Sequence, residues 1–126
     1  LISTLLVKAQ IPVLENYNPI WTTQSNNSSE SMPLGGGDIG LNVWVENGDL
    51  YFYFSRSGTF DEHNTLLKLG RVKVTLSPNP FTDNEGFRQE LVLKDGYVLI
   101  VQNNTKIKLW VDVFMPIIHL DLESEN

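Results

Sequence analysis

Apolar and polar residues alternate with a period of two in several segments from Gly40 onward. Residues 41–46 place Leu41, Val43 and Val45 on one face of a strand, and residues 50–54 place Leu50, Phe52 and Phe54 against that face. Asn47-Gly48 lies between them, a strong hairpin signal because both residues tolerate the positive φ of a type I′ turn. These segments therefore predict a β-hairpin.

The same alternation continues towards the C-terminus and predicts further strands. Residues 56–69 break the pattern and predict a loop. No segment has the apolar spacing of an amphipathic helix of twelve residues. The fold class is therefore all-β, most simply an antiparallel β-sandwich. The later strands are expected at 70–77, 87–94, 97–102, 105–114 and 117–122.

The last third of the chain predicts a meander with two tight turns, Asp95-Gly96 and Asn103-Asn104. If both are two-residue turns, Leu91 and Leu93 lie opposite Ile100 and Val98, and these in turn meet residues 107 and 109. One continuous apolar face would result. The final strand, 117–122, has no following segment to pair with it and is expected to be an edge.

Composition excludes several functions. The chain has 126 residues, about one domain, and a net charge of −6, which disfavours nucleic acid or an anionic membrane as a partner. It contains no Cys, which excludes disulfides, thiol catalysis and Cys-ligated zinc. No apolar run is long enough to span a bilayer. No cofactor is indicated.

The first residues, "LISTLLVKAQ", resemble the end of an export signal. A short apolar run precedes Val7-Lys8-Ala9. Val7 and Ala9 lie three residues and one residue before a cleavage site at Gln10, where the cleavage rule requires small residues. Residues 1–9 are therefore interpreted as a signal remnant, which predicts a secreted or periplasmic protein with its sandwich domain at 10–126. The alternative is that residues 1–9 form an ordinary first strand.

Candidate catalytic groups do not form a recognisable constellation. Asp61, Glu62 and His63 have metal-binding side chains, but adjacent loop residues rarely converge on one ion. The carboxylates to inspect first for paired acid-base chemistry are Asp38, Asp61 and Asp112. The sequence therefore predicts no catalytic residue and no metal ligand in this chain.

A glycine-rich segment contains Gly35, Gly36, Gly37, Asp38 and Gly40. A phosphate-binding loop would need a Lys and then a helix after its last glycine, whereas a period-two segment follows here. The glycines are better explained by positive φ and close backbone approach in a hairpin-entry loop. A loop at a domain interface or at the edge of a substrate site is the functional alternative.

Aromatic residues gather on one face of the predicted hairpin. Trp44, Tyr51 and Tyr53 share the face opposite the aliphatic one. Such a face suits sugar stacking, because C–H groups pack on rings whose polar tips reach hydroxyls. It equally suits packing against another sheet or domain, and the two interpretations remain open.

Several segments together resemble a family of secreted bacterial proteins. They are "SMPLGGGDIGLNVWVENGDLYFYFS", "LLKLGRVKVTLSPNPF", "FRQELVLKDGYVLIV" and "WVDVFMPIIHLDL". The N-terminal β-sandwich of that family is catalogued as a domain of unknown function. More distantly, the segments are similar to the N-terminal sandwich of glycoside hydrolase family 95. There a "PLGNGxxG" segment opens the first hairpin, and Gly36 replaces its Asn here.

The resemblance covers about residues 17 to 122 and implies a function in glycan breakdown. It implies that the sandwich is part of a larger super-sandwich, truncated here at its C-terminal end. In family 95 the catalytic acid and base lie in a following (α/α)6 barrel, so no catalytic residue can be assigned to this chain. The expected role is a non-catalytic domain that supports such a barrel. The alternative is a free-standing carbohydrate-binding module that uses the aromatic face.

Overall fold

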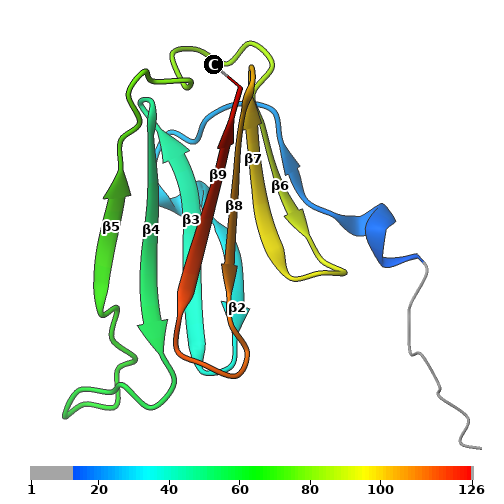
Figure 1. Ribbon diagram of the computed structural model, residues 1–126. Helices are drawn as coiled ribbons and strands as arrows, with labels where there is room; N and C mark the ends of the chain where they lie inside the picture. Colours follow the sequence, from blue (N-terminus) through cyan, green and yellow to red (C-terminus); the bar gives the residue numbers. More distant parts are fainter. Residues whose placement is uncertain (1–12, 126) are drawn as a thin grey trace, which may run out of the picture.

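The computed structural model describes residues 13–125, which form two antiparallel β-sheets packed as a sandwich (Figure 1). The predicted all-β fold class is confirmed. Between residues 13 and 125 there is no α-helix, and hence no helix long enough to cross a membrane. The proposed signal remnant at 1–9 lies outside the described residues.

The two sheets contain nine strands. The five-stranded sheet has the order β1 (Ile20–Trp21), β6 (Arg88–Val92), β7 (Tyr97–Gln102), β8 (Thr105–Val111) and β9 (Ile118–Ser124). The four-stranded sheet has the order β2 (Met32–Gly36), β3 (Ile39–Glu46), β4 (Asp49–Arg56) and β5 (Gly70–Val74). Two short 3-10 turns, η1 (Leu14–Tyr17) and η2 (Ser28–Glu30), complete the described elements.

The hairpin of β3 and β4 matches the prediction. Asn47 and Gly48 both have positive φ, 50° and 82°, as a type I′ turn requires. Val43 lies opposite Phe52 and Val45 opposite Leu50, so these apolar side chains share the inner face. This face supplies the four-stranded sheet's part of the core.

The meander is confirmed, but one of its two turns is longer than predicted. Asn103-Asn104 is a two-residue turn, whereas β6 and β7 are joined by the four residues 93–96. Leu91 therefore lies opposite Val98, not Ile100. The backbone N–H of Leu93 instead donates to the Asn18 side chain at 3.1 Å. Because the shift is two residues, the apolar face is preserved.

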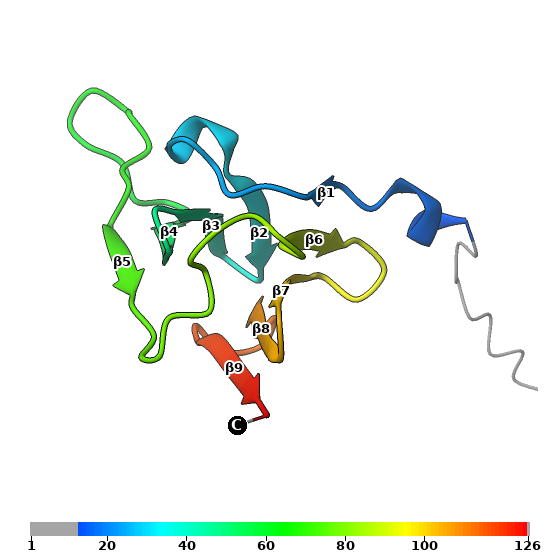
Figure 2. The same ribbon diagram turned by 90° about the horizontal axis from the view of Figure 1, so that it is seen from above.

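The two sheets contact each other chiefly through β2. β2 packs across the sandwich against β7 and β8. From this side the sheets diverge towards β5 and β9, the outer strands of the two sheets, as the view from above shows (Figure 2). The fully buried core residues come from both sheets: Met32, Val43, Val45, Leu50, Val98, Ile100, Ile107 and Leu109.

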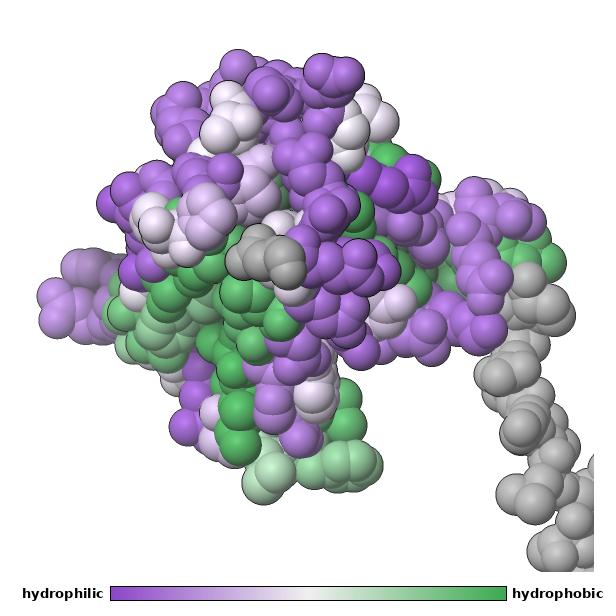
Figure 3. All heavy atoms as spheres, turned by 45° about the horizontal axis from the view of Figure 1, so that its top comes forward, coloured by the Kyte–Doolittle hydropathy of each residue, from purple (hydrophilic) through white to green (hydrophobic). Residues whose placement is uncertain are grey.

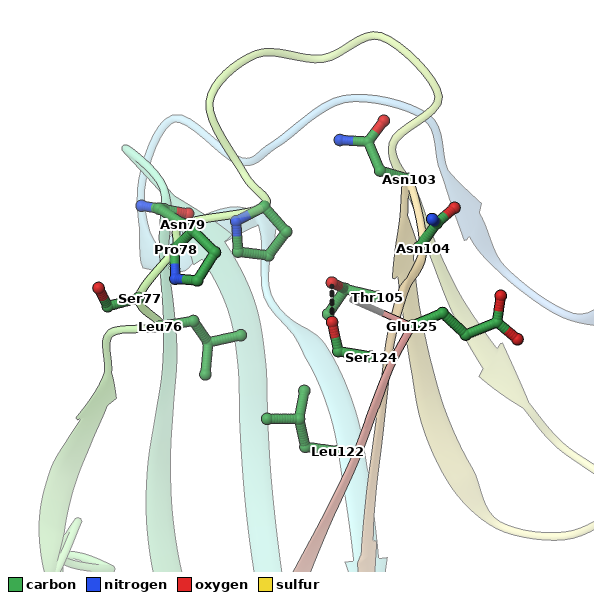
Figure 4. Close-up of a pocket in the computed structure, with 11 residues that line it drawn as sticks. Leu76, Ser77, Pro78, Asn79, Asn103, Asn104, Thr105, Leu122, Ser124 and Glu125 are labelled. Carbon is green, nitrogen blue, oxygen red and sulfur yellow. Dashed lines mark hydrogen bonds between the residues drawn. The ribbon is translucent and has the colours of Figure 1, made fainter.

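An apolar cleft opens between β5 and β9. A pocket of about 380 Å3 lies at its upper end, with Leu76 and Leu122 on its two sides (Figure 4). Thr105 and Ser124 close its inner end with a 3.4 Å hydrogen bond between their hydroxyls. Apolar side chains gather in the middle of this face of the molecule (Figure 3). On this side of the sandwich, β4, β5 and β9 add partly buried residues to the core: Phe54, Val72, Val74, Ile118 and Leu120.

Candidate functional site

The glycine-rich segment forms a strand and its turn, and not a loop that precedes the first hairpin. Gly35 and Gly36 are the last residues of β2, and Gly35 pairs with Gly40 of β3. Gly37 and Asp38 form a two-residue turn in which Gly37 has a φ of 58°. The prediction of a hairpin-entry loop was therefore wrong in position. Strand β2 was missed because Pro and consecutive glycines are rare within strands.

The glycines allow two backbones to approach each other closely. A Cβ atom on Gly36 would lie 2.6 Å from the carbonyl oxygen of Val111, at the end of β8. A Cβ on Gly37 would lie 3.1 Å from the carbonyl oxygen of Val113. The turn of the β2–β3 hairpin is thereby packed against the loop that joins β8 to β9. The predicted reason for these glycines, close backbone approach, is confirmed.

Asp38 is held in place by the end of β4. Its Oδ2 atom accepts a 2.6 Å hydrogen bond from Nε of Arg56, and its backbone oxygen accepts one of 2.8 Å from the N–H of Ser57. Both side chains of the ion pair are about half exposed, so the pair contributes little to stability. Its effect is to orient the turn.

The neighbouring loop, residues 112–117, is ordered by Asp112. The carboxylate oxygen Oδ1 of Asp112 accepts hydrogen bonds from the N–H groups of Phe114 (2.7 Å) and Met115 (3.0 Å). These two bonds hold the pKa of Asp112 below its usual value, because they favour the ionised carboxylate. The N–H of Asp112 also donates to the carbonyl of Ile117, which closes the loop at 3.0 Å.

This closed loop presents apolar side chains to solvent. Phe114 is 93% exposed, and Val113, Met115 and Ile117 are exposed as well. A pocket of about 280 Å3 lies between this loop and the Asp38–Arg56 pair. We call Val113, Phe114, Met115 and Ile117 the apolar tip. A fixed backbone that exposes large apolar side chains is typical of a protein-protein contact.

The aromatic residues form a packed cluster on the outer face of the four-stranded sheet. Trp44 is 1% exposed and stacks on Tyr51, with ring centroids 5.4 Å apart; it also packs at a tilt of 36° against Tyr53, with centroids 5.1 Å apart. Its indole N–H donates to Glu46 at 2.9 Å. Trp44 is therefore buried by its neighbours and offers no open ring face, whereas the two tyrosines remain partly exposed.

Positive side chains lie over the two tyrosines. Nζ of Lys68 is 4.1 Å from the ring centroid of Tyr53, and Arg71 and Lys73 lie 5.6 and 5.7 Å from that of Tyr51. These distances are typical of cation-π contacts. Sequence reasoning missed this layer, although Arg71 and Lys73 occupy outward positions of a predicted strand. Lys68 lies in a loop, and its contact could not be predicted from periodicity.

The carboxylates singled out in the sequence do not form a catalytic pair. Asp38 and Asp112 line the same pocket, whereas Asp61 lies in the loop after β4. Asp38 is bound to Arg56, and the pKa of Asp112 is lowered by backbone N–H groups, the opposite of what a general acid needs. Neither group is suited to protonate a glycosidic oxygen.

The Asp61–Glu62–His63 segment forms a loop. Oδ1 of Asp61 accepts hydrogen bonds from the backbone N–H groups of His63 and Thr65, at 2.9 and 2.8 Å. Nε2 of His63 lies 3.6 Å from Glu62, and both side chains are exposed. Within residues 13–125 no three potential ligands are grouped closely enough to hold a metal ion.

A family model described as a domain of unknown function (DUF5703) matches residues 20–126. Searches of curated proteins and of solved structures found no match. The matched range contains every described strand, the glycine turn, the apolar tip and the aromatic cluster.

Proposed function

The chain belongs to the family of domains of unknown function DUF5703, and we propose that it is a non-catalytic sandwich in an exported glycoside hydrolase-like protein. In this proposal the sandwich supports a following (α/α)6 catalytic barrel that acts in glycan breakdown. The link to glycan breakdown and to export comes from the resemblance of the sequence segments. The supporting role is also implied by that resemblance, and the geometry of the glycine turn and of the loop beside it supports it.

The apolar tip is the observation that carries the supporting role. Asp112 fixes the backbone of the 112–117 loop with two hydrogen bonds, so the exposure of Phe114 is built into the fold. Gly36 and Gly37 bring the turn of the β2–β3 hairpin against the same loop. Exposing such a surface to water is unfavourable by roughly 25 cal/mol per Å2 of apolar area. Contact with a second domain would remove that cost.

The polar groups beside the tip suit the rim of a domain interface. Asp38 and Arg56 form a half-exposed ion pair next to the apolar side chains. Interfaces commonly combine an apolar centre with a polar rim of this kind. Of the two functional alternatives for the glycine segment, a domain-interface loop or the edge of a substrate site, we therefore favour the domain interface.

A carbohydrate-binding module remains the second candidate. The partly exposed tyrosines Tyr51 and Tyr53 favour it, because their rings and hydroxyls lie on the outer face of the sheet. The burial of Trp44 weighs against it, since Trp44 would otherwise be the largest stacking surface. Lys68 also weighs against it, because its side chain lies over the ring of Tyr53.

The test uses the protein that contains this domain together with its following domain. Replacing Phe114 and Met115 by Asp should lower the temperature at which the protein unfolds and loses its catalytic activity. The reason is that two carboxylates would be placed in an apolar contact. Tyr17→Asp is the matched control, since Tyr17 is 70% exposed but lies on η1, away from the tip.

An unchanged activity and melting temperature in the double variant would refute the supporting role. Glycan retention on an affinity gel tests the second candidate separately. If the double variant behaves like the natural protein and Tyr53→Ala abolishes glycan retention, the domain is a carbohydrate-binding module.

A further inference from the structure

The cleft between β5 and β9 has two unpaired strand edges at its mouth. No described strand pairs with the outer side of β5 or of β9, so backbone N–H and C=O groups line both rims. Inside the rims lie Val72, Val74 and Leu120, all partly buried, and Leu122 is 48% exposed. An unpaired edge next to an apolar surface is a template for strand addition.

The two rims carry opposite charges on their outward positions. On β5 the outward residues are Arg71 and Lys73, and on β9 they include Asp121 and Glu123. All four residues are exposed to solvent. Lys73 already contacts Asp49 at 2.8 Å, and Asp121 accepts a 3.0 Å hydrogen bond from the indole N–H of Trp110. Neither Arg71 nor Glu123 forms an ion pair with another described residue.

We propose that the occupant of this cleft is a second copy of the chain, with β5 of each copy paired to β9 of the other. The opposite charges of the rims favour this pairing over the alternatives. Two β9 edges would bring acidic side chains together, and two β5 edges would bring basic ones together, which is destabilising. Pairing β5 with β9 brings acidic residues beside basic ones.

The directions of the strands are compatible with a closed dimer. β5 and β9 run in the same direction on the two sides of the cleft (Figure 1). A twofold axis parallel to these strands places β9 of one copy beside β5 of the other, with the strands parallel. Both edges are then covered at once, and the interface is the same patch on each copy, as in most dimers.

The sequence pattern of the two strands fits this pairing. A parallel register that places Arg71 beside Asp121 also places Lys73 beside Glu123. The residue between them, Val72, then lies beside Leu122 on the cleft side. One register thus matches both charges and the apolar residues, because the side chains of both strands alternate with the same period.

Light scattering coupled to size-exclusion chromatography tests the proposal. The mass that light scattering gives for the unsubstituted chain of 126 residues should be twice that of the monomer. Replacing Arg71 and Lys73 by Glu should give a monomer, as should replacing Asp121 and Glu123 by Lys. An equimolar mixture of the two variants should again show the doubled mass, because each rim then meets the opposite charge.

The mixing experiment separates lost pairing from lost folding, since a misfolded variant would not recover a partner. Arg88→Glu combined with Lys94→Glu makes the same change of charge on the β6 side and should remain dimeric. A natural chain that is monomeric at all concentrations would overturn the proposal. So would variants that stay dimeric alone, or a mixture that stays monomeric.

Discussion

Gly36 of β2 lies against Val111 of β8, and a Cβ atom at position 36 would be 2.6 Å from the Val111 carbonyl oxygen. The contact joins the two sheets at the end of the sandwich that carries the glycine turn. The nearest atoms on Val111 are backbone atoms and Cβ, which cannot move aside as the end of a flexible side chain can. The position therefore requires glycine for steric reasons, although its φ is not positive.

Gly36→Ala should therefore destabilise the fold by about 1–3 kcal/mol, the usual cost of forcing an extra carbon into a packed site. Urea denaturation measures the change as a lower midpoint. Gly40→Ala is the control, because a Cβ at Gly40 would lie 3.5 Å from the Ser55 hydroxyl, an ordinary contact. Equal midpoints for the two variants would contradict the steric account.

Trp44→Ala should cost about 3–5 kcal/mol of stability, as expected for a buried Trp. Trp44 is 1% exposed, and its ring stacks on Tyr51 and packs against Tyr53, so its removal leaves a cavity between them. Thermal unfolding followed by circular dichroism gives the change. An unaltered melting curve accompanied by loss of glycan binding would instead identify Trp44 as a sugar-stacking residue.

Glu90 should make stability depend on pH in the acidic range. Asn18 donates a 3.0 Å hydrogen bond to its carboxylate and, together with Arg88, holds the pKa of Glu90 below its ordinary value of 4.5. Because the folded-state pKa is lowered, this stabilisation is present above about pH 4.5 and is lost as the pH falls through the folded-state pKa.

The pH dependence is measured by comparing the natural chain with Glu90→Gln between pH 3 and pH 6, which are approximate limits around the ordinary Glu range. The stability difference should shrink as the pH falls. Asn18→Ala should raise the pKa of Glu90, which NMR titration of the carboxyl group can follow. A stability difference that stays constant over this range would contradict the account.

The isolated chain should release no nitrophenol from nitrophenyl fucosides or galactosides. Two described carboxylates, Asp38 and Asp112, share a pocket. Asp38 is bound to Arg56 and Asp112 to backbone N–H groups, and neither is placed to donate a proton. Hydrolysis that is abolished by Asp38→Ala would show that the chain is itself an enzyme.

The sequence predicts the strands well where alternation and turn residues agree, as in the β3–β4 hairpin with Asn47-Gly48. The prediction from sequence fails where a tertiary contact decides the local structure. In the β6–β7 connection, Leu93 does not pair with β7, and its N–H donates to Asn18, which lies 75 residues away in sequence. Strand β2 was not predicted because it contains glycines, and Gly36 is required there by its contact with Val111.

The candidate site was predictable only in part. The glycine segment and Asp38 were identified from the sequence, and the structure places them beside the loop that Asp112 orders. The exposed apolar tip was not predicted, because alternation cannot tell an exposed loop residue such as Phe114 from a buried one. Burial of Trp44 on the outer face likewise depends on its neighbours across the strands.

Hydroxyl-radical footprinting tests the proposed supporting role most directly, because Met and Phe side chains are both oxidised when they are exposed to solvent. In the isolated chain Phe114 and Met115 should react readily, being 93% and 53% exposed, and Tyr17 should react as an internal control. In a protein that includes the proposed following domain, oxidation of Phe114 and Met115 should fall sharply while oxidation of Tyr17 is unchanged. Equal oxidation of Phe114 and Met115 in both proteins would contradict the account.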